Sequence, residues 1–386
     1  MTETHLKTKE KAVLAGLCAA SMDARERSGD DTLDELESLL LTAGGEPVGR
    51  VLQNRRAPDP RTFIGDGKAK EMKNLIEAEG ASLAVFDNEL SPSQTRALSD
   101  ELGVRVIDRS TLILDIFAER ASTRVGRLQV ELAQYKYLLP RLSGMWGHLT
   151  SQTGVSAPIG TRGPGETQLE TDRRHIRRRI ARLEDEIGGI MRNLATERRR
   201  REKNEIPVIA LVGYTNAGKS TLFNRLTGAE THAGDRLFDT LDTTTRRASL
   251  PGLMGSARST AALVTDTVGF IRKLPHHLID AFRATLDELR YADLVLHVVD
   301  ASNPARLEHA RVTDELISEL GAGKTPRIEV FNKCDLQGAD ARPLGENAVS
   351  VSAATGEGIG ELLRLAGRLL ETARRASPDK LQKQEM

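Results

Sequence analysis

The sequence has few cysteines and no excess of charge of either sign. Only Cys18 and Cys334 occur among 386 residues, which excludes a disulfide framework and a cysteine-based zinc site. Lys plus Arg and Asp plus Glu number 55 each, so net charge does not indicate a polyanionic partner. No apolar run is long enough to span a bilayer, and the charged N-terminus lacks the apolar core of a signal peptide. We therefore expect a cytoplasmic protein with no membrane span, and we expect a monomer, although the sequence itself does not determine the oligomeric state.

Short apolar runs alternate with helical patterns in the first third of the chain. Strands are expected at 12–17, 48–52, 83–86 and 104–107, and helices at 32–40, 69–78 and 91–102. Asp31 or Thr32 is the expected cap of the first helix, and Ser91 or Ser93 that of the last. This alternation predicts a small N-terminal α/β domain over 1–121 with a mostly parallel sheet.

Two apolar seams with steps of three and four follow, and they predict a long antiparallel helical hairpin over 122–204. The first seam ends at Pro140, where we expect the helix to stop. The seams consist of Leu128, Leu132, Tyr135 and Leu139, then Ile176, Ile180, Leu183, Ile187, Ile190 and Leu194. Gly188 and Gly189 should weaken the second helix by about 1 kcal/mol each. The glycine-rich tip loop, about 143–170, includes Trp146 and has a length typical of functional or disordered loops.

The alternation of strands and helices resumes in the last part of the chain. Strands are expected at 207–212, 262–266, 294–300, 327–331 and 348–352, and helices at 219–226, 278–291, 306–320 and 359–374. This order predicts a Ras-like, doubly wound G domain over 205–375, followed by a flexible tail over 376–386.

A glycine-rich run links the first strand of this part to its first helix. It fits the P-loop pattern G-x-x-x-x-G-K-[ST] with Gly213, Tyr214, Thr215, Asn216, Ala217, Gly218, Lys219 and Ser220. Its backbone N–H groups would wrap phosphates at a helix N-terminus. Lys219 would reach the β- and γ-phosphates, and the Ser220 hydroxyl would ligate Mg²⁺. The pattern alone does not separate a GTPase from an ATPase or a kinase.

A second motif, which follows the apolar strand 328–331, separates these classes. It comprises Asn332, Lys333, Cys334 and Asp335. Asp335 would accept hydrogen bonds from the ring N–H and the exocyclic amine of guanine, and adenine lacks this pair of donors. Asn332 and Lys333 would hold the loop and pack on the base. At the end of the last strand, backbone N–H groups suit the guanine O6, at Ser352, Ala353 and Ala354. The sequence therefore predicts a site for GTP and GDP.

Two segments between these motifs predict contacts to the metal and the γ-phosphate. One is Asp266, Thr267, Val268 and Gly269, in which Asp266 would hold Mg²⁺ through a water and the Gly269 N–H would contact the γ-phosphate. The other is a switch I segment, Phe238, Asp239, Thr240, Leu241 and Asp242. We choose Thr240 as the threonine that closes over Mg²⁺, although spacing leaves Thr243, Thr244 and Thr245 open. The catalytic contacts are thus assigned to Lys219, Thr240 and Gly269, and the metal ligands to Ser220 and Thr240.

Phe270 follows Gly269, where Ras-like proteins often place a glutamine that orients the attacking water. A phenyl ring cannot do this, so we expect intrinsic turnover on the order of 10⁻³ s⁻¹ or below. A side chain from 272–277 is the alternative source of that function. His276 and His277 are interpreted as caps of the following helix.

The sequence resembles the HflX GTPases of the translation-factor class over about residues 10–375. The similar segments are 63–68 (FIGDGK), 127–134 (RLQVELAQ), 160–174 (GTRGPGETQLETDRR), 238–246 (FDTLDTTTR) and 266–278 (DTVGFIRKLPHHL). The sequence departs from the family where Thr243 follows Asp242 in place of a frequent proline, and it ends soon after the last expected helix, whereas some members carry a further C-terminal domain.

The resemblance implies binding to the large ribosomal subunit through the hairpin and the N-terminal domain, and a role in splitting or rescuing ribosomes under stress. Independently, arginines cluster on the second hairpin helix and suit RNA phosphates. They are Arg173, Arg174, Arg177, Arg178, Arg179 and Arg182, followed by the basic run 198–203. The alternatives are a solvated face balanced by neighbouring acidic residues, and a regulatory GTPase whose hairpin binds a protein partner. An ATP-dependent activity of the N-terminal domain also stays open.

Overall fold

The computed structural model describes residues 9–145, 164–203, 206–229, 234, 237–238, 243–250, 260–275, 278, 287–336 and 345–376. The chain divides into two compact units. The first comprises Met1–Glu119, Arg127–Ile187 and Pro275–Leu278, and the second comprises Arg120–Gly126, Gly188–Leu274 and Ile279–Met386. Within the described residues, no helix is both long and apolar enough to cross a membrane.

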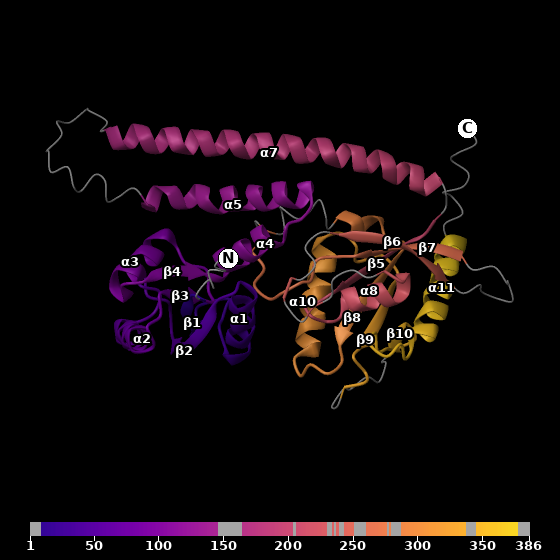
Figure 1. Cartoon of the computed structure of the whole chain (residues 1–386), viewed down its shortest axis with the longest axis horizontal. Coiled ribbons are helices and arrows are strands. Elements are labelled where there is room, and N and C mark those ends of the chain that lie inside the picture. The colour runs from indigo at the N-terminus through magenta and orange to yellow at the C-terminus, as the bar shows by residue number, and fades with distance from the viewer. Residues whose placement is uncertain are drawn as a thin grey trace, which may run out of the picture. The chain divides into compact units, whose positions relative to one another are not determined.

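The first unit contains a four-stranded, fully parallel sheet of order β2-β1-β3-β4 (Figure 1). Its elements are β1 (Lys11–Ala19), α1 (Asp30–Thr42), β2 (Glu46–Arg55), α2 (Asp66–Glu79), β3 (Leu83–Phe86), α3 (Pro92–Leu102), β4 (Arg105–Asp108), α4 (Arg109–Arg120) and α5 (Arg124–Met145). The strands β1 and β3 are almost entirely buried, as expected for a sheet covered on both faces. The expected strands and helices are present, and α4 is an addition.

The cap of α1 differs from the prediction. Gly29 is the N-cap, and Thr32 lies in the first turn, where its Oγ1 accepts from the Gly29 N–H at 2.9 Å. Thr32 therefore supplies a hydrogen-bond acceptor for the N-cap N–H from within the first turn of the helix. For α3 the prediction of Ser91 is confirmed, because its side chain accepts from the Gln94 N–H at 3.2 Å.

The helix α5 continues past Pro140 to Met145, so the predicted stop is wrong. Proline removes one helical hydrogen bond, but contacts made by Arg141 hold the last turn. Its guanidinium donates to the Leu90 carbonyl at 3.1 Å and to Asp108 at 3.3 Å, and it stacks over the Tyr137 ring at 3.4 Å. Tertiary contacts thus override the local helix breaker.

The hairpin pairs α5 with α7 (Pro164–Lys203), which run side by side in Figure 1. Leu183 and Ile187 are buried on α7, as are Val130 and Leu132 on α5. Two ion pairs reinforce the seam: Arg179 contacts Glu131 at 2.6 Å, and Lys136 contacts Glu184 at 2.8 Å. Most of the expected tip loop, including Trp146 and Arg162, lies outside the described residues.

The second unit contains a six-stranded sheet of order β10-β9-β8-β5-β7-β6. Its elements are β5 (Val208–Gly213), α8 (Lys219–Thr227), β6 (Thr244–Leu250), β7 (Thr260–Asp266), η1 (Asp287–Tyr291), β8 (Leu294–Asp300), α10 (Arg306–Glu319), β9 (Arg327–Asn332), β10 (Ala348–Ser350) and α11 (Ile359–Ala376). All neighbouring strands are parallel except β6, which pairs antiparallel with β7. The predicted fold class, a doubly wound G domain preceded by a small α/β domain and a helical hairpin, is confirmed.

Two elements of this unit differ from the sequence expectation. The edge strand β6 was not predicted, because its polar, arginine-containing sequence has no continuous apolar run. The expected helix at 278–291 ends as the 3₁₀ turn η1, and residues 279–286 lie outside the described part of the chain. The predicted division into three domains and a tail stays a prediction.

Candidate functional site at the carboxyl edge of the second sheet

The P-loop links β5 to α8, at the carboxyl edge where open α/β sheets bind ligands. Gly218 caps α8 with a φ of 85°, and a Cβ there would collide with the side-chain amide of Asn332. Lys219 is buried, and its Nζ donates to the carbonyls of Gly213 at 3.1 Å and Tyr214 at 2.8 Å. Burial lowers the pKa of Lys219 to about 8, against the opposing effect of the Asp266 charge. An anion beside Lys219 would favour its charged form.

Ser220 and Asp266 bring two side-chain oxygen atoms together beside this lysine. The Ser220 hydroxyl donates to Asp266 Oδ2 at 2.7 Å, and Asp266 is buried at the end of β7. Oxygen donors suit a hard cation such as Mg²⁺. No group of three or more His, Cys, Asp or Glu side chains arranged to hold a metal occurs among the described residues. The donor set therefore fits Mg²⁺, which commonly uses one or two protein ligands with phosphate oxygens and water.

The Asp266–Gly269 run lies against the P-loop. The Thr267 hydroxyl donates to the Leu211 carbonyl at 2.7 Å, which ties the run to β5. A Cβ at Gly269 would come within 2.8 Å of Thr215 Cγ2 and 3.0 Å of Lys219 Nζ, so only glycine fits. Phe270 is 1% exposed and packs inside the protein. Its burial gives a physical reason why this side chain does not face an attacking water.

Asn332 connects the base motif to both neighbouring loops. Its Nδ2 donates to the Ala217 carbonyl at 2.9 Å, and its Oδ1 accepts from the Ala353 N–H at 3.0 Å. Lys333 has a φ of 63°, and its Nζ pairs with Asp300 at 2.8 Å. Asp335, the next-but-one residue, is exposed to solvent. The motif is thus rigidly held while the carboxylate predicted to bind the base stays accessible.

The Ser352–Ala354 loop offers fewer donors than the sequence indicated. The Ser352 N–H donates to the Glu357 carbonyl at 3.0 Å, and the Ala353 N–H is used by Asn332. These bonds already use the N–H groups of Ser352 and Ala353, and the assignment of this loop to guanine O6 stays a prediction. Ser352 is fully buried, and its Oγ accepts from the Thr355 N–H at 3.1 Å, so this side chain shapes the loop.

Two residues that the sequence analysis missed hold these loops. Arg225 of α8 donates to the carbonyl of Ala353 at 3.1 Å and to that of Ala354. Asp300, at the end of β8, pairs with Lys333. The position of Asp300 at the carboxyl end of a buried strand was a usable signal. The sequence around Arg225 carried no such signal, because its hydrogen-bond partners lie 128 and 129 residues away.

Of the predicted switch I residues, Phe238 is 3% exposed and has a φ of 56°. Asp239, Thr240, Leu241 and Asp242 lie outside the described residues, as do His276 and His277. Among the alternative threonines, Thr245 belongs to β6, and its Oγ1 is 3.0 Å from that of Thr265. Thr244 pairs with Asp266 across the sheet. The choice of Thr240 stays a prediction.

A small cavity of about 50 Å³ lies behind the P-loop, lined in part by Thr215 and His297. His297 of β8 is 1% exposed, and burial lowers its pKa to about 3, helped by the positive charges of Arg327 and Lys219. Asp314 lies 3.4 Å from His297 Nδ1, but it is already paired with Arg327 at 2.5 Å. The imidazole is therefore neutral at physiological pH.

Family models match the chain in three consecutive segments. Residues 30–118 match the GTP-binding GTPase N-terminal model, and residues 120–201 match the GTP-binding GTPase Middle Region. Residues 208–333, which hold the P-loop and the beginning of the base motif, match the 50S ribosome-binding GTPase model.

Curated relatives extend this similarity over nearly the whole chain. GTPase HflX of Caldanaerobacter subterraneus subsp. tengcongensis is 47% identical over 95% of this chain and 82% of its own length. GTPase HflX of Lacrimispora saccharolytica is 48% identical over 96% of this chain and 86% of its own. Among solved structures, a GTP-binding protein from Sulfolobus solfataricus in complex with GDP is 24% identical, with a TM-score of 0.46 over 94% of this chain and 99% of that one.

Proposed function

Because the chain belongs to the HflX family of GTPases, we propose that it is a Mg²⁺-dependent enzyme that associates with the large ribosomal subunit and splits or rescues ribosomes under stress. The chain binds GTP and GDP and hydrolyses GTP. The observation that carries the ribosomal part of the proposal is the match of residues 208–333 to a 50S ribosome-binding GTPase. The hairpin, described below, supplies the physical support.

In this proposal the carboxyl edge of the second sheet holds the nucleotide. The P-loop and Lys219 bind the phosphates, Asp335 selects guanine, and the Gly269 N–H contacts the γ-phosphate together with Thr240. Three contacts support these roles, because Lys219 donates to a P-loop carbonyl and both Gly269 and Asn332 lie against P-loop residues. The 1% exposure of Phe270 supports slow intrinsic turnover, which ribosomal particles are proposed to accelerate.

Ser220 and Thr240 would hold Mg²⁺ directly, and Asp266 would hold it through a water. When bound, the ion neutralises charge on the β- and γ-phosphates. We expect Ser220→Ala to weaken binding of a non-hydrolysable GTP analogue more than binding of GDP, because the γ-phosphate depends most on the metal. Calorimetric titration with both nucleotides measures this difference, and equal small losses would contradict the role of Ser220.

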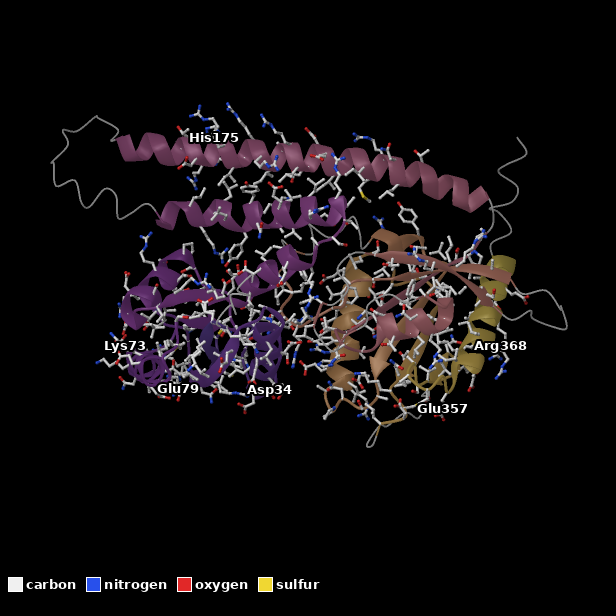
Figure 2. The ribbon with its side chains drawn as sticks, viewed as in Figure 1. Asp34, Lys73, Glu79, His175, Glu357 and Arg368 are labelled. Carbon is white, nitrogen blue, oxygen red and sulfur yellow. The ribbon has the colours of Figure 1, made fainter. Side chains whose placement is uncertain are left out.

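The hairpin would carry RNA contacts, and the N-terminal domain would add to them. Arg174, Arg178 and Arg182 are exposed on α7 at intervals of four residues, so they share one side of the helix. Figure 2 shows nitrogen-tipped side chains along the side of α7 away from α5, near the labelled His175. Arg179, by contrast, is paired with Glu131 at the seam. Exposed arginines at this spacing suit consecutive phosphates of an RNA backbone.

Co-sedimentation with purified ribosomal subunits tests the proposal. We expect the full chain to sediment with the large subunit, and more with a GTP analogue than with GDP. Changing Arg174, Arg178 and Arg182 to Glu should weaken sedimentation and reduce the slope of log K against log[salt] by about 2–3. The matched control is Arg368→Glu, an exposed arginine of α11 labelled in Figure 2.

The outcomes separate the ribosomal role from its alternative. If sedimentation with the large subunit depends neither on the bound nucleotide nor on the three arginines, the proposal is contradicted. A protein partner for the hairpin is then favoured. GDP binding should stay unchanged in the arginine variant, because the nucleotide contacts lie on other elements.

A further inference from the structure

The P-loop and the residues that follow Gly269 are joined by backbone hydrogen bonds. The Thr215 N–H donates to the Phe270 carbonyl at 2.7 Å, and the Phe270 N–H donates to the Gly213 carbonyl at 3.1 Å. Tyr214 and Phe270 thereby form a parallel bridge, beyond the ends of the paired strands β5 and β7. The position of Gly269 beside Lys219 therefore depends on where residues 270–272 lie.

The side chain of Tyr214 adds a contact to the same residues. Tyr214 is 6% exposed, and its hydroxyl accepts from the Arg272 N–H at 2.8 Å. Its ring stacks on the His309 ring of α10, with centroids 3.7 Å apart and planes within 2° of parallel. The stack fixes the ring, and a fixed ring places the hydroxyl at one position.

The helix α10 also reaches Arg272 directly. The Arg272 guanidinium is 11% exposed and lies 3.4 Å from the carboxylate of Glu308, the residue before His309. Residues 270–272 are thus contacted by the P-loop backbone, by the Tyr214 hydroxyl and by α10. Neither Tyr214 nor His309 belongs to the contacts that the P-loop pattern itself requires, since the pattern leaves the tyrosine position open.

We propose that Tyr214 is a positioning residue that raises the affinity of the protein for GTP relative to its affinity for GDP. Through Arg272 it fixes residues 270–272, and through them it holds the Gly269 N–H where a γ-phosphate beside Lys219 would accept from it. The inference rests on the proposed nucleotide site, and it adds a specificity determinant at a P-loop position that the pattern leaves open, acting through its side chain.

The expected effect is confined to one nucleotide. The P-loop backbone, Asn332 and Asp335 would serve GTP and GDP alike, whereas Gly269 would meet only the γ-phosphate. Removing the tyrosine hydroxyl leaves the stack and the P-loop backbone in place. The loss should therefore appear in the affinity for a GTP analogue and leave the affinity for GDP unchanged.

The test is calorimetric titration of the full chain and its Tyr214→Phe variant with a non-hydrolysable GTP analogue and with GDP, each with Mg²⁺. Analogue affinity should fall by about 3- to 10-fold, the effect of one neutral hydrogen bond, and GDP affinity should change by less than about 2-fold. His309→Ala removes the stack without altering the P-loop, and it should lower the ratio of the two affinities in the same direction. Tyr291→Phe, an exposed tyrosine of the same unit, is the matched control.

Two results would overturn the proposal. An unchanged ratio in both the Tyr214 and the His309 variants would show that the contact does not act on Gly269. Equal losses for both nucleotides would show that Tyr214 only shapes the P-loop. Failure of the nucleotide site itself is distinguishable, because the unaltered protein would then bind no GDP.

Discussion

Both sheets carry polar side chains at the carboxyl ends of parallel strands. The hydrogen-bonding and charge partners of these side chains differ between the two sheets. In the first unit, Asp87 follows β3 and Asp108 ends β4. Arg109 lies between two buried carboxylates, with Glu35 at 2.5 Å and Asp87 at 2.8 Å, and it is only 2% exposed. This edge is neutralised by the protein's own side chains.

The corresponding edge of the second unit is organised around backbone and glycine. Gly218 and Gly269 occupy positions where a Cβ would collide with neighbouring side chains, and Lys219 is held by carbonyl groups rather than by a paired carboxylate. Polar residues at a carboxyl edge therefore do not by themselves make a ligand site. What distinguishes the nucleotide edge is a buried cation, held by carbonyls and approached closely by backbone.

The largest expected effect comes from breaking the closed network of the first unit. Arg109→Met should destabilise this unit by about 3–5 kcal/mol, because it leaves two buried carboxylates without their cation. Hydrogen exchange of the β1 to β4 amides measures the change. Arg50→Met is the control, since Arg50 pairs with Asp34 and Glu37 at the surface and should cost less than about 1 kcal/mol. Similar losses in both variants would contradict the closed-network interpretation.

The next largest effect should come from the open edge. Asp335→Asn replaces an acceptor by a group that matches xanthine, so GTP affinity should fall about 100-fold and affinity for xanthosine triphosphate should rise. Fluorescent nucleotide titration measures both. Glu357→Gln, a nearby exposed carboxylate labelled in Figure 2, should leave both affinities unchanged. Unaltered GTP binding in the Asp335 variant would remove its assignment.

A smaller effect on stability is expected from His297. It is buried in its neutral form, whereas Arg109 is buried as a cation between two carboxylates. The pKa of His297 is about 3 in the folded protein, against about 6.5 when unfolded. As pH falls, His297 is therefore protonated at a higher pH in the unfolded chain than in the folded protein. This difference lowers the free energy of unfolding as pH falls from 6.5 towards 3. Between pH 6.5 and pH 5 the cost is about 2 kcal/mol. His297→Leu should remove it, as seen in hydrogen exchange of the β5 and β8 amides at both pH values. An identical pH dependence in the variant would exclude this origin.

The smallest effect is expected in α7, where the chain passes from one unit to the other. Among the residues that the structure describes, a Cβ at Gly188 or Gly189 would meet only the Arg192 side chain, at 3.7 and 3.8 Å. Alanine should therefore stabilise the helix by about 0.5–1 kcal/mol at each position, without altering either edge. Gly16→Ala is the contrasting variant, because its Cβ would lie 2.7 Å from the Ser28 Cβ. Amide exchange along α7 reports the gain, and a loss at Gly188 or Gly189 would show that glycine is required there.

The motifs could be found from the sequence because each depends on neighbours along the chain. Gly213–Ser220 follows an apolar strand and opens a helix, and Asn332 follows another apolar strand. Local patterns failed where distant groups intervened. The helix α5 passes Pro140 because Arg141 contacts Leu90 and Asp108, and the polar strand β6 forms because β7 offers it a partner.

The sequence by itself determined the fold class, the order of the nucleotide motifs and the absence of a water-orienting side chain at Phe270. Only the tertiary structure decided which polar groups satisfy one another: Arg109 with Glu35 across 74 residues, and Arg225 with Ala353 across 128. It also decided that Tyr214 would meet Arg272 and His309. The physical reason is the separation of the interacting residues along the sequence. Propensities and turn chemistry act within a few residues, whereas such contacts form only after the chain has closed long loops and packed its core.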